Sequence, residues 1–212
     1  MTSAGVKTLR AEIEATLRPL ADVNQAAPMG AYMLDQFKFL GIRATPRRDV
    51  LRELFKHLNL TAVDLLAKHH TRLQAGNLPR LLQLVQKRSW WDTVDGLAGV
   101  VSKSMRQFQS QKSLAQELMD ECLTHSDPWV RRVAMLHQLG WKKETDEERL
   151  LRYALALGSE TDFFIRKAIG WALRDYARTR PEVVRTFLRK NENRLSGLTR
   201  REAGKHLDLS GK

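Results

Sequence analysis

The sequence at residues 127–134 is DPWVRRVA, and at residues 162–169, 35 positions later, it is DFFIRKAI. Each segment has an acidic, an aromatic, a β-branched and two basic residues in the same order. SWWDTVD at 89–95 lies about one period upstream with a looser match. A period of 35 to 40 residues in a helical chain indicates stacked helix pairs. The sequence therefore predicts a curved solenoid whose second helices carry basic residues toward the concave face: Arg131, Arg132, Arg166 and Lys167.

Helix signals surround this repeat, whereas alternating β-branched runs are nearly absent. Apolar residues recur at helical spacing in two clear stripes, Leu78, Leu81, Leu82, Val85 and Leu150, Leu151, Ala154, Leu155. Asp127-Pro128 is typical of a helix start. Three pairs have the spacing of a capping box, Thr145 with Glu148, Thr179 with Glu182, and Thr199 with Glu202. We therefore expect an all-α solenoid of antiparallel helix pairs, with residues 1–212 forming one domain.

The chain is strongly basic, with 36 Lys and Arg against 24 Asp and Glu and a net charge of +12. Such an excess favours a polyanionic partner, of which nucleic acid is the common one. The sole cysteine, Cys122, excludes an internal disulfide. No apolar run approaches the roughly 20 residues that span a membrane, and the first 20 residues have no apolar block. We therefore expect a cytoplasmic protein, associated with the nucleoid through DNA, that has no contact with a membrane.

The motifs of metal and nucleophilic catalysis are missing from this sequence. His69 and His70 are adjacent rather than four residues apart, and Cys122 has no nearby partner cysteine. There is no Gly-rich phosphate loop and no Gly-x-Ser-x-Gly. We expect no metal and no cofactor.

Two other segments place aromatic and charged residues together. Trp91 and Asp95 are four residues apart, so they share a helix face, as do Lys167, Trp171 and Asp175. An indole beside a carboxylate attracts a cation. Two such indoles on neighbouring repeats could hold a flat, positively charged base, although a single tryptophan is usually part of the core.

These segments resemble the AlkD family of DNA alkylation-repair glycosylases, which are built from HEAT-like helical repeats. The similarity begins at YMLDQFKFLGIRATPRR (32–48) and continues through SWWDTVD (89–95) and DPWVRRVAMLHQL (127–139). It is strongest in TDFFIRKAIGWALRDY (161–176) and extends to LSGLTRREAGKHL (195–207). One departure lies before Ala62, where Asn59-Leu60-Thr61 replaces a longer segment of the family.

The resemblance implies a role for individual residues. Asp95 corresponds to the catalytic carboxylate, and Trp91 and Trp171 correspond to the two tryptophans of the excision site. Arg132 corresponds to the basic residue that holds backbone phosphate near the lesion. Arg131, Lys167 and Arg166 are expected to add DNA contacts, as is Tyr32 in the first similar stretch.

The resemblance implies a monofunctional glycosylase that acts on double-stranded DNA as a monomer without a cofactor. It would release 3-methyladenine and 7-methylguanine and leave an abasic site, probing the lesion without full base flipping. The alternative is a HEAT-repeat protein that binds DNA or serves as a scaffold without chemistry. An RNA-binding repeat protein is a third class, but the side-chain code of one base per repeat is not visible.

Overall fold

The computed structural model describes residues 11, 14–32, 36, 39–43, 46–47, 62–87, 89–108 and 110–207. The chain divides into two compact units, residues 1–62 and 63–212. The single domain expected over residues 1–212 stays a prediction. The short segment at residues 59–61 lies outside the described residues.

The N-terminal unit contains a 3₁₀ turn, η1 (Arg18–Leu20), and helix α2 (Val23–Tyr32). Gly41, at φ +71°, lies against the start of α2, where a Cβ atom would come within 1.9 Å of the Asp22 carbonyl oxygen. Only glycine allows this approach, in which the Asp22 amide donates to the Leu40 carbonyl at 2.8 Å. Tyr32 is the last residue of α2 and is 59% exposed.

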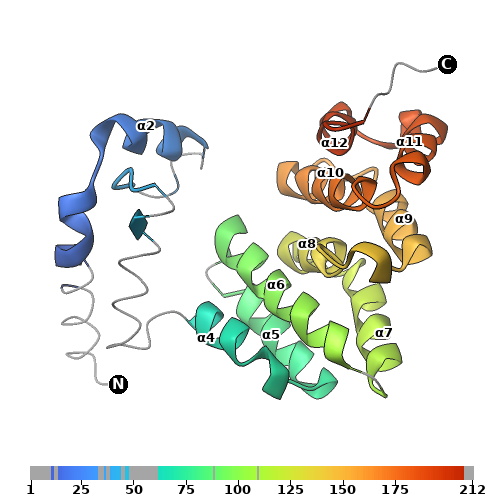
Figure 1. Ribbon diagram of the computed structural model, residues 1–212, viewed down its shortest axis with the longest axis horizontal. Helices are drawn as coiled ribbons and strands as arrows, with labels where there is room; N and C mark the ends of the chain where they lie inside the picture. The colour runs from blue at the N-terminus through green and yellow to red at the C-terminus, as the bar shows by residue number, and fades with distance from the viewer. Residues whose placement is uncertain are drawn as a thin grey trace. The chain divides into compact units, whose positions relative to one another are not determined.

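The C-terminal unit consists of helices in its described residues (Figure 1). The α-helices are α4 (Ala62–Lys68), α5 (Leu78–Val85), α6 (Trp91–Gln107), α7 (Lys112–Cys122), α8 (Pro128–Leu136), α9 (Glu147–Ala156), α10 (Phe163–Ala177), α11 (Pro181–Lys190) and α12 (Gly197–Ala203). The 3₁₀ turns are η2 (His70–Arg72), η3 (Ala75–Asn77), η4 (Lys142–Glu144) and η5 (Glu192–Arg194). Both predicted apolar stripes form helices, α5 and α9.

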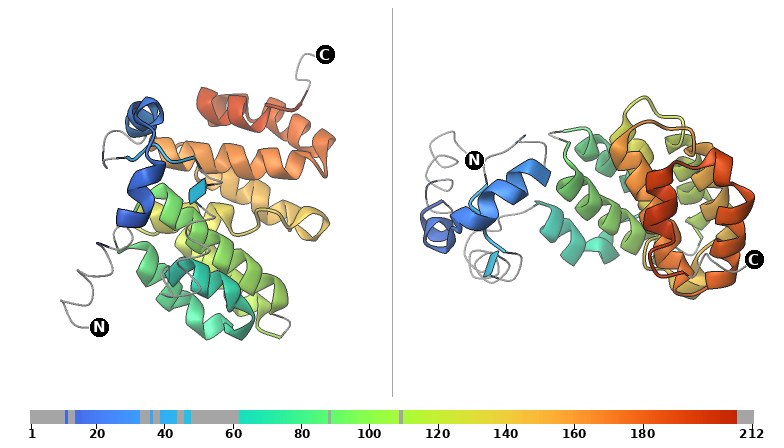
Figure 2. Two further views of the ribbon diagram at one scale, coloured as in Figure 1. Left: turned by 60° about the vertical axis from the view of Figure 1, so that its left-hand side comes forward. Right: turned by 90° about the horizontal axis from the view of Figure 1, so that it is seen from above.

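Helices α6, α8, α10 and α12 form an inner layer, in which each packs on the next, and α5, α7, α9 and α11 cover it (Figures 1 and 2). Helix α10 packs most extensively on α12 and α8, whereas α9 and α11 pack on α10 more than on each other. A close inner layer and a splayed outer layer make a stack that curves toward its inner helices. This arrangement confirms the all-α solenoid of helix pairs.

The repeat supplies equivalent positions in this inner layer. Asp127 and Asp162 cap α8 and α10, accepting from the amides of Trp129 at 2.8 Å and Ile165 at 2.9 Å. Val130 and Ile165, matched in the sequence, are both buried. The cap at Asp127 was predicted correctly, because the carboxylate directly precedes the proline that starts the helix.

The three capping boxes are wrong. Asp146, Arg180 and Ser196 precede α9, α11 and α12 in place of Thr145, Thr179 and Thr199. Asp146 and Ser196 accept from backbone amides three residues later, and α11 begins at Pro181, which has no N–H and therefore needs no acceptor. Glu202, expected at the start of a helix, lies near the end of α12, where its carboxylate is free to reach another helix.

His137 is buried at the end of α8 and has a structural role. Its Nδ1 lies 2.6 Å from the Ala134 carbonyl oxygen and its Nε2 lies 3.1 Å from the side-chain amide of Gln116. Burial lowers the pKa of His137 to about 4, which keeps the ring neutral. The unfolded chain, with an ordinary histidine, takes up a proton at a higher pH than the folded chain does.

This difference predicts a loss of stability in acid. As the pH falls from 7 to 4.5, His137 should remove about 2–3 kcal/mol from the free energy of unfolding, because protonation favours the unfolded chain. Urea unfolding at the two pH values measures the change. The His137→Gln variant is the control and should show a smaller pH dependence by this amount. Equal pH dependence in both proteins would contradict the assignment.

Candidate functional site

A carboxylate and a guanidinium join two neighbouring inner helices. Asp95 lies one turn into α6, and Arg132 lies on α8. Arg132 donates from Nε to Oδ1 of Asp95 at 2.8 Å and from a terminal nitrogen to Oδ2 at 2.9 Å. Its other terminal nitrogen donates to the carbonyl of Phe164, at the start of α10. One side chain therefore connects three inner helices, and its bidentate pairing fixes the plane of the carboxylate.

The surroundings oppose ionisation of Asp95 but leave it partly accessible. Its side chain is 22% exposed, whereas that of Arg132 is 1% exposed. Burial raises the pKa of Asp95 above its ordinary value, the Arg132 guanidinium opposes this rise, and the charge of Asp92 adds to it. A carboxylate with an elevated pKa, held in one orientation and open on one side, is typical of catalytic sites.

Trp171 of α10 completes the group. The Arg132 guanidinium lies 5.4 Å from the centre of its ring, and Nζ of Lys167, one turn earlier on α10, lies 5.5 Å from it. Trp171 is half-buried. The fold thus gathers Asp95, Arg132, Lys167 and Trp171 from three helices. Trp91 is half-buried at the first position of α6, four residues before Asp95.

Both cations beside Trp171 have an acidic partner. Arg132 pairs with Asp95, and Lys167 donates to Glu202 of α12 at 2.8 Å. Arg174 also donates to Glu202, at 3.1 Å. The site is therefore a set of neutralised pairs around an indole, extending over α6, α8, α10 and α12.

The placement of Arg132 bears on the expected phosphate contact. A guanidinium that is 1% exposed and already donates to Asp95 and Phe164 has no surface to offer a phosphate in this structure. It acts instead as the partner that keeps Asp95 charged and oriented. The phosphate contact of Arg132 stays a prediction, and a sequence does not show that a basic residue at a helix start points inward.

The other predicted DNA contacts are more dispersed. Arg131 donates to the carbonyls of His125 and Ser126 and pairs with Glu160 at 2.8 Å. Arg166 donates to the backbone carbonyl of Glu160 at 2.7 Å. Both therefore brace the loops that precede α8 and α10. Tyr32 belongs to the N-terminal unit, and its contact with DNA stays a prediction.

An aromatic cluster at the starts of the inner helices was missed in the sequence. Trp90, Trp129 and Phe164 have ring centres 5.0–6.0 Å apart, and Phe163, which is 47% exposed, lies 5.2 Å from Phe164. The repeat contained the signal, because it matched Trp129 with Phe164. Equivalent residues of stacked repeats contact each other, so matched aromatic residues predict a stack.

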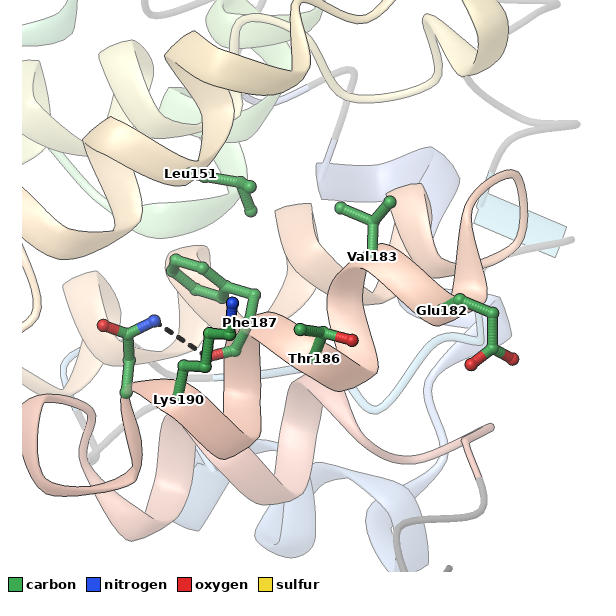
Figure 3. A pocket seen from close by; sticks show the side chains of 7 residues that line it. Leu151, Glu182, Val183, Thr186, Phe187 and Lys190 are labelled. Atoms are coloured by element: carbon green, nitrogen blue, oxygen red, sulfur yellow. Dashed lines mark hydrogen bonds between the residues drawn. The ribbon is translucent and has the colours of Figure 1, made fainter.

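An apolar groove lies away from this group, on the outer layer between α9 and α11. Its volume is about 400 Å³, and Leu151 faces Val183 and Phe187 across it (Figure 3). The described residues contain no cluster of His, Cys, Asp and Glu that could hold a metal ion. Among the same residues, no helix is both long and apolar enough to cross a membrane.

Comparisons with known proteins agree on one family. The model of the family described as DNA alkylation repair enzyme matches residues 13–207. A solved structure, a predicted DNA alkylation repair enzyme from Enterococcus faecalis, is 26% identical and has a TM-score of 0.70. The alignment covers 90% of this chain and 98% of that one. A search of curated proteins found no match.

Proposed function

This chain belongs to the DNA alkylation repair enzyme family, and from that premise we propose that it is a DNA glycosylase. It hydrolyses the N-glycosidic bond of purines that carry a positive charge after alkylation at N3 or N7, in duplex DNA. The observation that carries the proposal is the Asp95 carboxylate, oriented by Arg132 and partly open to solvent, in a group that includes Trp171.

The reaction needs a negative charge more than it needs an acid. A cationic base leaves as a neutral molecule, so it requires no proton. As the bond breaks, the deoxyribose acquires the positive charge of an oxocarbenium ion. A carboxylate held nearby stabilises this charge and can orient the attacking water. Asp95 fits this role because its two oxygens are fixed by Arg132 before any substrate binds.

Trp91 and Trp171 provide the apolar surface of the site. We infer that the indoles pack on the deoxyribose of the lesion and stabilise its cationic character. With the base left largely in the duplex, the protein would select lesions by their positive charge and their labile N-glycosidic bond. It would not read the edge of the base. Basic residues other than Arg132 would hold the phosphates, in keeping with the net charge of +12.

The product should be an abasic strand without a nick. A lyase needs an unprotonated amine to form a Schiff base with the sugar. The amine closest to the indole, Nζ of Lys167, donates to Glu202 at 2.8 Å and is 5.5 Å from the Trp171 ring. An ammonium held by a carboxylate is a poor nucleophile, which supports a monofunctional enzyme.

Substrate choice provides the test of the proposal. We expect release of 7-methylguanine and 3-methyladenine, and no release of uracil or hypoxanthine, because a neutral base would depart as an anion. His137, which directly follows the helix that carries Arg132, is buried and neutral and so offers no proton. Methylated duplex DNA and single-lesion duplexes with 7-methylguanine, uracil or hypoxanthine would be incubated with the protein, and free base measured by chromatography.

The outcomes separate the two functions left open by the sequence. Binding of duplex DNA without release of any base would favour the non-catalytic DNA-binding protein. Comparable release of uracil and 7-methylguanine would contradict the charge-driven mechanism, because it requires contacts to the base itself. Borohydride trapping of the protein on DNA would contradict the absence of an amine nucleophile.

A further inference from the structure

Glu202 of α12 lies across the face of α10 that carries Trp171. Lys167 and Arg174, four residues before and three residues after Trp171, both donate to its carboxylate, at 2.8 and 3.1 Å. All three charged side chains are 16–23% exposed. The Lys167 hydrogen bond is the main cause that lowers the pKa of Glu202, and a hydrogen bond from Trp171 contributes.

Gly170 allows α12 to approach this closely. A Cβ atom at residue 170 would lie 2.4 Å from Cβ of Glu202 and 3.1 Å from the Thr199 carbonyl oxygen. Thr199 also donates from its hydroxyl to the Arg166 carbonyl at 3.1 Å. Gly170, directly before Trp171 in the sequence, therefore lets the backbone of α12, and with it Glu202, lie next to the indole.

We propose that Glu202 is a positioning residue for the excision site, which holds Lys167 and Trp171 in place and neutralises the lysine beside the indole. This inference deepens the proposed function and rests on it. Glu202 acts through Lys167 and Trp171, and it needs no contact with the substrate.

The charges explain why the site needs this carboxylate. Two cations lie 5.4 and 5.5 Å from the centre of the Trp171 ring, and each is paired with one acidic residue. Without Glu202, the ammonium of Lys167 would be uncompensated next to the place proposed for a cationic nucleoside. Like charges repel at this range, while the same additional positive charge attracts phosphate.

The Glu202→Gln variant separates these two effects. We expect kcat/KM for release of 7-methylguanine to fall about 10-fold, because a positive charge opposes the cationic nucleoside. Affinity for undamaged duplex should stay equal or increase. A residue that only stabilises the fold would not lower excision while preserving or raising affinity. Unchanged excision, or a parallel loss of excision and affinity, would overturn the proposal.

The matched control is Glu147→Ala. Glu147 lies on α9 and accepts from the hydroxyl of Tyr176 at 2.6 Å, so its loss also removes a tether of α10. Its hydrogen bond with Tyr176 involves neither Trp171 nor Lys167. Excision and affinity should both stay at the wild-type values. A 10-fold fall in the control would show that any loosening of α10 is sufficient, and would overturn the specific role of Glu202.

A measurement without DNA tests the positioning independently. Protein labelled with 5-fluorotryptophan has a ¹⁹F resonance for Trp171, identified by its loss in Trp171→Phe. Glu202→Gln and Glu202→Ala should shift and broaden this resonance, whereas Glu147→Ala should not. An unchanged resonance would overturn the positioning role. If the wild-type protein releases no base, the proposed function fails, but the ¹⁹F result still decides whether Glu202 holds Trp171.

Discussion

The Asp95→Asn variant should release 7-methylguanine about 10²–10³ times more slowly than the wild-type protein, since one oriented charge at the transition state has this effect. Asparagine keeps the size of the side chain but cannot oppose the charge of an oxocarbenium ion. Its NH₂ group would also face the Arg132 guanidinium, which offers only donors. Single-turnover excision from a duplex with one lesion measures the rate, and thermal unfolding shows whether the variant is folded.

Asp92→Asn is the matched control, because Asp92 is an exposed carboxylate on the same helix whose charge raises the pKa of Asp95 and whose hydrogen bonds are to Thr93. Its excision rate at neutral pH should stay close to wild type. Excision by the wild-type protein should fall as the pH drops through the elevated pKa of Asp95, since protonation removes the charge. Asp92→Asn should move this fall to lower pH. A wild-type rate in Asp95→Asn would refute the assignment of the carboxylate.

The Arg132→Met variant should lose about 3 kcal/mol of unfolding free energy. This value is at the lower end of the losses seen when one partner of a buried ion pair is removed, because Asp95 keeps some contact with water. It should also lose excision activity, since Asp95 is then neither oriented nor kept charged by its partner. Arg132→Lys keeps the charge but not the two parallel hydrogen bonds, and should recover only part of both losses. Urea unfolding and single-turnover excision measure the two effects.

A double-mutant cycle with Asp95→Asn decides whether the two residues act as one unit. The double variant should be more stable than the sum of the two single losses predicts. Each single variant leaves one charged side chain buried without its partner, whereas the double variant leaves neither. The salt dependence of binding to undamaged duplex should stay as in the wild type, since a guanidinium that is 1% exposed neutralises no phosphate. A shallower salt dependence would instead restore the phosphate contact expected from the sequence.

Much of the fold was predictable from local patterns. The stripe at Leu78–Val85 and the Asp127-Pro128 start are short-range features, and both form helices as expected. The repeat also predicted which helices share a layer. The capping boxes failed because a spacing of three residues between a hydroxyl and a carboxylate also occurs inside helices, as Thr199 and Glu202 show.

The sequence alone determined which residues are brought to one layer, because a 35-residue period places Arg132 of α8 and Lys167 of α10 at equivalent positions. It also placed Trp91 with Asp95 and Lys167 with Trp171, since residues four apart share a helix face. Only the tertiary structure decided the partners. Arg132 turns inward to Asp95, 37 positions away, and Glu202 reaches Lys167 from 35 positions away. Such pairings depend on how closely helices pack and which side chains lose water, and a local pattern contains neither quantity.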